Sequence, residues 1–110
     1  MQYTMTAIKR LLYWLIAGSE GGLNRARILL ALRDQPLNSN QLSERVGLNY
    51  KTVRHHLDVL EKNELVIPVG KRYGKMFFLS PLMEREWEEF EAIVAEIGHN
   101  DLRATLSEGE

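Results

Sequence analysis

Hydrophobic residues between positions 48 and 66 recur with the spacing of an amphipathic helix. Val53, Leu57 and Leu60 follow one another at intervals of four and three residues, which places them on one face. Basic and imidazole side chains occupy the rest of the same helix, namely Lys51, Arg54, His55 and Lys62. The pattern predicts a helix over residues 49–63 with a buried apolar face and a basic outer face, a form that suits the major groove of double-stranded DNA.

A short pattern typical of helix starts occurs three times along the chain. It consists of an apolar residue, an asparagine, and a second apolar residue four positions beyond the asparagine. The three copies are Leu23-Asn24…Ile28, Leu37-Asn38…Leu42 and Leu48-Asn49…Val53. Each copy predicts an asparagine N-cap supported by a contact between its two apolar residues.

The helices that begin at the second and third copies must lie very close together in the chain. Gln41 stands three residues after Asn38 and completes a capping-box pair, while Gly47 is typical of a helix end. Only Leu48 separates Gly47 from the Asn49 cap, so two short helices meet at a tight turn. This arrangement predicts a helix-turn-helix, preceded by a helix over residues 24–34.

The segment 4–17 predicts a helix that is apolar on nearly every side. Its apolar residues are Ile8, Leu11, Leu12, Tyr13, Trp14, Leu15 and Ile16. A helix of this kind must be covered on both faces, and a domain of this size can cover only one of them. We therefore expect a dimerisation helix with Ile8, Leu12 and Leu15 in the interface, followed by a turn over residues 18–22.

Residues 65–69 and 75–79 have the composition of two strands around a glycine-bounded turn at 70–74. They predict a β-hairpin, the wing. The turn and its flank contain Lys71, Arg72 and Lys75, and no acidic residue occurs between Leu65 and Leu82. We expect the tip of the wing to lie against a phosphate backbone.

The last predicted helix spans residues 81–98, with Ser80 as its cap and Pro81 in its first turn. Its apolar residues follow spacings of four, three, four and three: Met83, Trp87, Phe90, Val94 and Ile97. This heptad-like seam predicts a second dimerisation helix whose outer glutamates stay away from DNA. Residues 99–110 are expected to be a frayed tail.

Composition and charge are consistent with one small, asymmetrically charged domain. With 110 residues and 45% hydrophobic content, the chain can bury one modest core, so we expect a single domain over 1–110 that contains the winged helix-turn-helix at 22–80. Residues 1–80 carry 12 basic and 6 acidic residues, whereas residues 81–110 carry 2 and 9. The net charge of −1 therefore conceals a basic first part, which is compatible with nucleic-acid binding.

Two features of the sequence bear on compartment and targeting. The absence of cysteine leaves no disulfide or thiolate metal site and is compatible with a reducing cytoplasm, where we expect the protein. Lys9-Arg10 before the apolar run 11–17 imitates a targeting segment. That run has seven residues, the lower limit for a signal peptide and far below the ~20 needed to span a bilayer, so no membrane partner is expected.

The segment 41–66, and more loosely 24–80, resembles the winged helix-turn-helix regulators of the ArsR type, especially archaeal members. The motif that carries the resemblance is K-T-V-R-H-H-L-D-V-L-E-K-N-E-L-V, residues 51–66. The resemblance implies a mainly α-helical fold with a small β-hairpin and N- and C-terminal dimerisation helices. It also implies DNA-binding homodimers that pair through their first and last helices.

The sequence departs from the family pattern at two places. Glu64 stands where the family usually has glycine, so we expect Asn63 to take the left-handed turn at the helix end. The cysteine motif of the metal-sensing members is absent, and the family's second sensor motif falls here on Glu86, Glu88, His99 and Leu102. Because Leu102 cannot bind a metal and Gly98 is expected to interrupt the helix, we predict no metal and no cofactor.

The residues expected to contact DNA lie on the predicted recognition helix and the wing. They are Asn49, Tyr50, Lys51, Thr52, Arg54, His55, Lys71, Arg72 and Lys75. Arg54 would fork onto guanine O6 and N7, and Lys51 would reach a phosphate or a guanine. The alternatives are a solvated helix face and an exposed hairpin without a partner. His56 borders the apolar face and is expected to pack or to orient a phosphate contact.

These observations predict a transcriptional regulator that binds a specific double-stranded DNA sequence as a homodimer. One alternative is a winged-helix module that docks on an acidic protein surface without binding DNA. Another is a monomeric domain whose terminal helices engage a different chain. No nucleophile with a paired base and no phosphate-cradling loop occurs, so an enzyme is not expected. Trp14, Trp87 and Phe90 are expected to anchor the core or the dimer, and a small-molecule effector between paired helices stays open.

Overall fold

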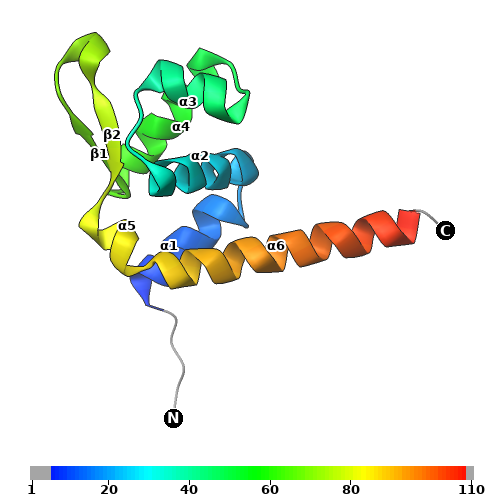
Figure 1. Ribbon diagram of the computed structural model, residues 1–110. Coiled ribbons are helices and arrows are strands. Elements are labelled where there is room, and N and C mark those ends of the chain that lie inside the picture. Colours follow the sequence, from blue (N-terminus) through cyan, green and yellow to red (C-terminus); the bar gives the residue numbers. More distant parts are fainter. Residues whose placement is uncertain (1–5, 109–110) are drawn as a thin grey trace.

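The computed structural model describes residues 6–108, with side chains for all of them except 73 and 99–108. The protein is a winged helix-turn-helix with additional helices at both ends (Figure 1). In chain order the elements are α1 (Ala7–Ile16), α2 (Gly22–Asp34), α3 (Ser39–Val46), α4 (Tyr50–Lys62), β1 (Val66–Val69), the 3-10 turn η1 (Arg72–Gly74), β2 (Met76–Leu79), α5 (Pro81–Arg85) and α6 (Trp87–Glu108).

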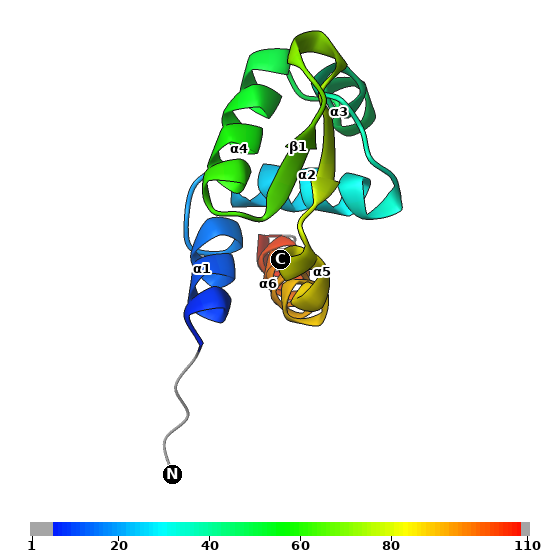
Figure 2. The ribbon, with the colours of Figure 1, turned by 90° about the vertical axis from the view of Figure 1, so that its left-hand side faces the viewer.

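The elements form an upper and a lower layer in the orientation of Figure 1. The upper layer holds α3, α4 and the β1–β2 wing, and α2 runs beneath them (Figure 1). The lower layer holds α1, α5 and α6, with α1 and α6 packed against each other (Figure 2). The second half of α6 extends beyond the rest of the molecule as an arm (Figure 1).

The predicted helix-turn-helix is present with the expected caps. The Asn38 side chain accepts a hydrogen bond from the Gln41 backbone N–H, and the Gln41 side chain accepts one from the Asn38 N–H, each at 2.8 Å. Gly47 ends α3 in the left-handed conformation at φ 69°, and Asn49 Oδ1 accepts from Lys51 N at 2.7 Å to start α4. The turn between α3 and α4 is therefore set by local side-chain chemistry that the sequence displays.

The predicted start of α2 at Asn24 is wrong. The helix begins at Gly22, with Gly21 as its N-cap in the left-handed conformation at φ 83°. The reason is a close approach to α1, because a Cβ on Gly22 would lie 1.9 Å from the Ile16 carbonyl oxygen. Asn24 thus lies inside the helix, where its side chain accepts a hydrogen bond from Arg27. The N-terminal helix begins at Ala7 and is capped by Thr6, whereas its predicted start at residue 4 lies outside the described residues.

The exit from α4 also differs from expectation. Asn63 keeps φ −95°, and Glu64 takes the left-handed conformation at φ 61°. The Asn63 side chain donates to the Val59 carbonyl at 2.8 Å and so caps the last turn. The chain reversal then falls on Glu64, after which the Leu65 N–H closes onto the Leu60 carbonyl at 2.9 Å.

The wing is an antiparallel pair in which Val66 faces Leu79 and Val69 faces Met76. Leu37, in the connection between α2 and α3, adds a single bridge to Phe77 on β2, with N–H···O distances of 2.8 and 3.3 Å. This bridge, which the sequence did not predict, ties the wing to the start of the helix-turn-helix.

The C-terminal part departs most from its prediction. The expected single helix over 81–98 is two helices, which meet at Glu86. Ser80 caps α5 as predicted, accepting from Met83 N at 3.0 Å. The helix does not stop at Gly98, and α6 continues through Glu108, so the predicted tail is wrong for residues 99–108. One glycine inside a helix costs only about 1 kcal/mol relative to alanine, which a long helix tolerates.

Most of the predicted dimer seam lies inside this chain. Leu12, Leu15, Met83, Trp87 and Phe90 are buried in the chain's own core. Their assignment to a contact between chains is corrected accordingly, since α1 and α6 pack on each other and already cover these side chains. Three predicted interface residues remain half-buried at the surface: Ile8, Val94 and Ile97.

Candidate nucleic-acid interface

The outer face of α4 presents several of the predicted DNA-contacting residues. Lys51 and His55 are exposed, and Tyr50 retains 44% of its accessible surface. Thr52 is half-buried, and Asn49 uses its side-chain oxygen to cap the helix. The opposite face is buried as predicted through Val53, Leu57 and Leu60, so the orientation of α4 is fixed by the core.

Arg54 is less free than the sequence suggested. Its Nη1 donates to Ser39 Oγ at 3.3 Å and its Nη2 to Asp58 Oδ1 at 3.3 Å, while the guanidinium lies 5.8 Å from the centre of the Phe77 ring. Both terminal nitrogens therefore already have partners within the chain. A fork onto guanine would have to use the remaining N–H groups of Arg54 or break these hydrogen bonds.

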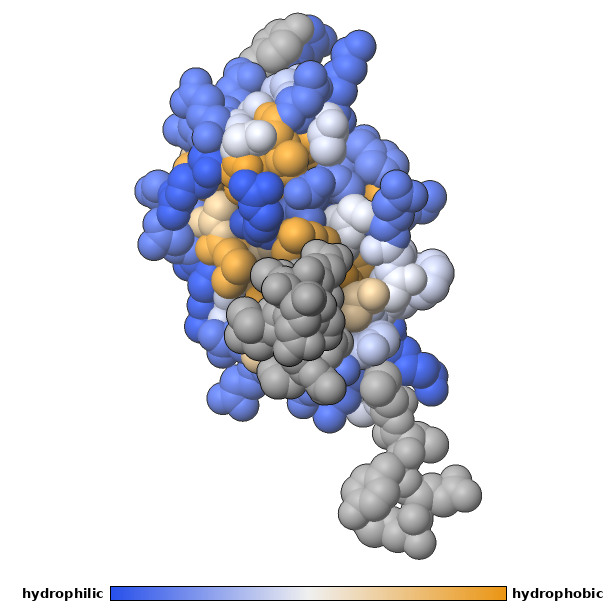
Figure 3. Space-filling view, turned by 90° about the vertical axis from the view of Figure 1, so that its right-hand side faces the viewer, coloured by the Kyte–Doolittle hydropathy of each residue, from blue (hydrophilic) through white to orange (hydrophobic). Residues whose placement is uncertain are grey.

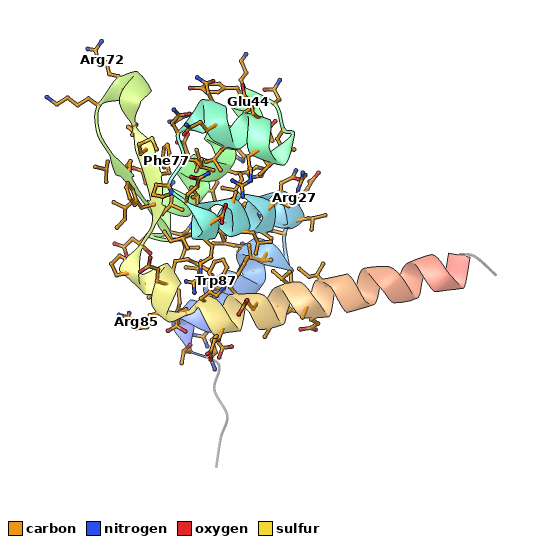
Figure 4. The ribbon with its side chains drawn as sticks, in the orientation of Figure 1. Arg27, Glu44, Arg72, Phe77, Arg85 and Trp87 are labelled. Atoms are coloured by element: carbon orange, nitrogen blue, oxygen red, sulfur yellow. The ribbon has the colours of Figure 1, made fainter. Side chains whose placement is uncertain are left out.

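The wing carries its charge at the tip. Lys71 and Arg72 are exposed, Lys75 is half-buried, and Figure 4 shows Arg72 extending away from the body at the upper end. The turn depends on Gly70 at φ 107°, because a Cβ there would lie 2.9 Å from the Gly74 carbonyl oxygen. The predicted basic residues of the wing are thus held at the same end of the molecule as α3, on which Glu44 is labelled (Figure 4).

A small cavity brings parts of the interface together. It has a volume of about 40 Å³ and lies between the start of α3, α4 and the wing. Its lining residues are Asn38, Ser39, Asn40, Tyr50, Arg54, Arg72 and Lys75. We call this cavity the notch. Four of these residues were predicted to contact DNA, whereas Asn38, Ser39 and Asn40 were not.

A buried polar cluster lies behind α4, and the sequence had indicated only one of its members, His56. Arg25 is buried and donates to the Leu15 carbonyl at 2.9 Å, to Ser19 Oγ at 2.6 Å and to the Glu20 carbonyl at 3.1 Å. Its Nη1 lies 3.4 Å from His56 Nδ1. His56 is buried, as expected for a packing residue. The available signal for Arg25 was its place on the same helical face as Ile28, Leu29 and Leu32.

Burial is the main cause of the shifted ionisation in this cluster. It lowers the pKa of the His56 imidazole below the ordinary value, and the positive charges of Arg25 and His55 lower that pKa further. Burial also lowers the pKa of the Arg25 guanidinium. An arginine has no acceptor, so His56 Nδ1 must accept the hydrogen bond and the imidazole is neutral in this arrangement.

The acidic residues of the C-terminal part lie in the other layer. Glu84, Glu88 and Glu91 are exposed on α5 and α6, and Glu89 pairs with Lys9 of α1 at 3.1 Å. Figure 4 places Arg85 and Trp87 at the end of the molecule opposite Arg72. The basic wing and the glutamate-rich helices are therefore separated by the body of the domain.

Neither a membrane-spanning helix nor a metal site occurs among the described residues. Within residues 6–108 no helix is both long and apolar enough to cross a bilayer. Among the side chains that the structure describes, no three from histidine, aspartate or glutamate come close enough together to hold a metal ion. The side chains of His99 and Leu102, which the sensor motif would require, lie outside the described set.

Comparison with family models gives one match, to the bacterial regulatory proteins of the arsR family, over residues 24–67. This segment is therefore similar to the helix-turn-helix of that family. It includes α3, α4 and most of α2, and it contains the motif at 51–66 that carries the resemblance. No curated protein is similar to the chain in sequence at a significant level. The likeness to archaeal members is not supported, since the matched family is described as bacterial.

Solved structures of similar fold cover most of the chain. One is described as a probable transcriptional regulator from Pseudomonas aeruginosa and has a TM-score of 0.64 at 19% identity. The superposed part is 94% of this chain and 89% of that chain. Reduced HlyU from Vibrio cholerae has a TM-score of 0.58 at 24% identity, covering 81% and 85%. The S. aureus MepR–DNA complex has a TM-score of 0.59 at 16% identity, covering 90% and 83%. At these identities the likeness establishes the winged-helix fold.

Proposed function

We propose that this protein is a transcriptional regulator that binds a specific double-stranded DNA sequence as a homodimer. In this proposal α4 lies in the major groove and the wing lies along the flanking phosphate backbone. The observation that carries it is the position of the exposed Lys51, His55, Lys71 and Arg72 on the layer opposite the glutamates of α5 and α6. The ArsR-type match and the similar fold of the MepR–DNA complex support it.

The proposed dimer uses the lower layer. Val94 and Ile97 are half-buried on α6, and Trp14 on α1 retains 61% of its accessible surface. Figure 3 shows apolar surface beside the projecting end of α6, on the face to the right of Figure 1. A second copy packed on α1 and α6 would cover such residues and leave both α4 helices free. Two-fold symmetry would then place the α4 helices about 34 Å apart, one turn of DNA.

Selection of binding sites from a random duplex pool tests this proposal directly. A homodimer that reads DNA through α4 should enrich two half-sites related by two-fold symmetry, about 10 base pairs apart from centre to centre. A pool that remains unenriched after several rounds at low salt would contradict DNA reading. Enrichment of a single, asymmetric half-site would contradict the dimer while leaving DNA binding in place.

The dimer has a separate test in solution. Ile97→Glu would put a charge into the proposed contact between copies, and light scattering should then report a monomer whose circular dichroism is unchanged. Glu96→Gln, at an exposed neighbouring position, should leave the mass unchanged. A wild-type protein that scatters as a monomer at every concentration would contradict the homodimer.

One observation favours a second candidate, a winged-helix module that binds proteins. The outer face of the wing is apolar, because Ile67, Val69 and Phe78 keep 40%, 54% and 39% of their accessible surface. Such a face can serve as a contact with another protein. Retention of the protein on random duplex at low salt would favour DNA binding, whereas free passage together with capture of an acidic protein would favour this candidate.

A further inference from the structure

The notch is the enclosed polar site closest to the proposed DNA surface. Its volume of about 40 Å³ suits a few atoms the size of water. Pockets for drug-sized ligands have volumes of roughly 300 Å³ or more. The notch therefore fits a small polar group, and its lining contains no carboxylate.

Hydrogen-bond donors line one side of the notch. It opens at the start of the eight-residue helix α3, where the capping box occupies the N–H groups of Asn38 and Gln41. Within the described part of the chain, the backbone N–H groups of Ser39 and Asn40 donate no hydrogen bond. Free N–H groups at a helix start, together with the helix dipole, favour an anion.

Positive side chains from two other elements complete the notch. Arg54 of α4 is held there by Ser39, whose side chain is 8% exposed and whose Oγ accepts from the guanidinium at 3.3 Å. Lys75, half-buried between η1 and β2, and Arg72, exposed at the tip of the wing, also line the cavity. The cavity thus combines three cationic residues from α4 and the wing with free donors from α3.

We propose that the notch binds one phosphate of the DNA backbone and that Arg54 anchors this phosphate and does not read a base. This inference rests on the proposed DNA-binding function and names the group that the site takes. A phosphate would receive hydrogen bonds from Ser39 N–H and Asn40 N–H and charge from Arg54 and Lys75. It would fix α4 relative to the backbone, and the base contacts would fall to Lys51, Thr52 and His55.

Titration of the full chain with inorganic phosphate tests the notch without DNA. In ¹⁵N-resolved spectra, the Ser39 and Asn40 amides and the Arg54 Nε–H should shift together and saturate. Lys75→Gln should weaken this binding at least about tenfold, the factor that 1.4 kcal/mol represents. Arg45→Gln, an arginine at the far end of α3 that pairs with Asp34, is the matched control and should leave it unchanged. Chemical shifts that change without saturation would overturn the phosphate site. Phosphate binding that is weakened equally in Lys75→Gln and Arg45→Gln would also overturn it.

The DNA arm uses a selected duplex in which one phosphate at a time is replaced by a neutral methylphosphonate. One position per half-site should weaken wild-type binding and should cost Arg54→Gln clearly less affinity, because that variant has already lost one of the groups that bind the phosphate. Replacement of guanines by 7-deazaguanine should weaken wild type and Arg54→Gln by the same factor. If 7-deazaguanine weakens binding of the wild type but not of Arg54→Gln, Arg54 contacts a base, and its proposed role as a phosphate anchor is overturned. Failure of wild type to bind any duplex would instead defeat the proposed function, and the phosphate titration would still decide the notch.

Discussion

Arg25 of α2 and His56 of α4 are neighbours in the core, with Arg25 Nη1 3.4 Å from His56 Nδ1. Through its other donors Arg25 also holds the end of α1 and the following loop, at the Leu15 and Glu20 carbonyls. Gly21 closes this loop over the ring, since a Cβ there would lie 2.7 Å from His56 Cε1. One buried side chain therefore connects the lower layer to the rear of the proposed recognition helix.

This pair predicts a loss of stability in mild acid. Burial disfavours the charged imidazole of His56, and a protonated His56 would also lose the Arg25 hydrogen bond and place two positive charges together, so its folded pKa lies below the ordinary 6.5. Below about pH 6.5 the unfolded chain therefore binds a proton at this histidine more readily than the folded chain does. The free energy of unfolding is highest above about pH 6.5 and falls as the pH drops through that value toward the lower folded pKa. Urea unfolding at about pH 7.5 and pH 5.5 measures this difference.

Two histidine variants identify the group responsible. His56→Gln offers Arg25 an acceptor that does not titrate in this range, so the difference between the two pH values should shrink. His55→Gln removes the exposed neighbour and should keep most of the difference. An acid dependence that survives in His56→Gln and disappears in His55→Gln would contradict this assignment.

The exit from α4 predicts opposite effects at adjacent positions. Glu64→Gly should stabilise the fold by about 1 kcal/mol, because glycine adopts the left-handed conformation at φ 61° without steric cost. Asn63→Gly should destabilise it, since the variant loses the hydrogen bond to the Val59 carbonyl and gains only backbone freedom. Denaturant midpoints compare the two. Stabilisation by Asn63→Gly would place the left-handed turn at the wrong residue.

Two glycines test where helices begin and end. Gly98→Ala should raise the helix content and the stability by about 1 kcal/mol, because α6 continues through this position and a Cβ there meets nothing within 4 Å. Gly22→Ala should destabilise strongly, because the new Cβ would overlap the Ile16 carbonyl. Circular dichroism with thermal melts reads out both variants. A Gly98→Ala variant with unchanged or reduced helicity would indicate that α6 ends before this residue.

The sequence specified the parts of the fold that local chemistry determines. Asn38 with Gln41, Gly47 and Asn49 each carry a cap or a stop that follows from the residue itself, and these predictions were confirmed. The start of α2 was missed because it depends on how closely Gly22 approaches α1, a contact between elements that no local pattern shows.

The same distinction explains the site. The periodicity of α4 predicted its buried face, whereas the hold of Ser39 and Asp58 on Arg54 depends on where α3 lies and on which rotamer the arginine adopts. The heptad spacing of Trp87 and Phe90 was recognised but assigned to a second chain. An apolar seam of this kind does not reveal whether it is covered from within or by a partner. Here the chain's own α1 packs on α6, and Arg33 of α2 lies 4.8 Å from the centre of the Trp87 ring.

Two lysines separate base reading from backbone contact in the proposed complex. Lys51→Ala, on the exposed face of α4, should cost about 1–3 kcal/mol on a selected duplex and much less on random DNA. Lys71→Ala, at the tip of the wing, should weaken both duplexes by the same factor, because a phosphate contact carries no sequence information. Anisotropy titrations on the two duplexes give all four affinities. Equal losses for both variants on both duplexes would refute this division of roles.

The central claim is that the basic α4 and wing bind the phosphate backbone of double-stranded DNA. Its most direct test is the affinity of the wild-type protein for a selected duplex over a range of salt concentrations. Each phosphate neutralised should contribute about −0.9 to the slope of log affinity against log salt. If both copies bind DNA through α4, the wing and the notch, the slope should be steeply negative. Each phosphate contact of a lysine or arginine that is removed should make the slope shallower by about 1. A slope near zero would contradict the account.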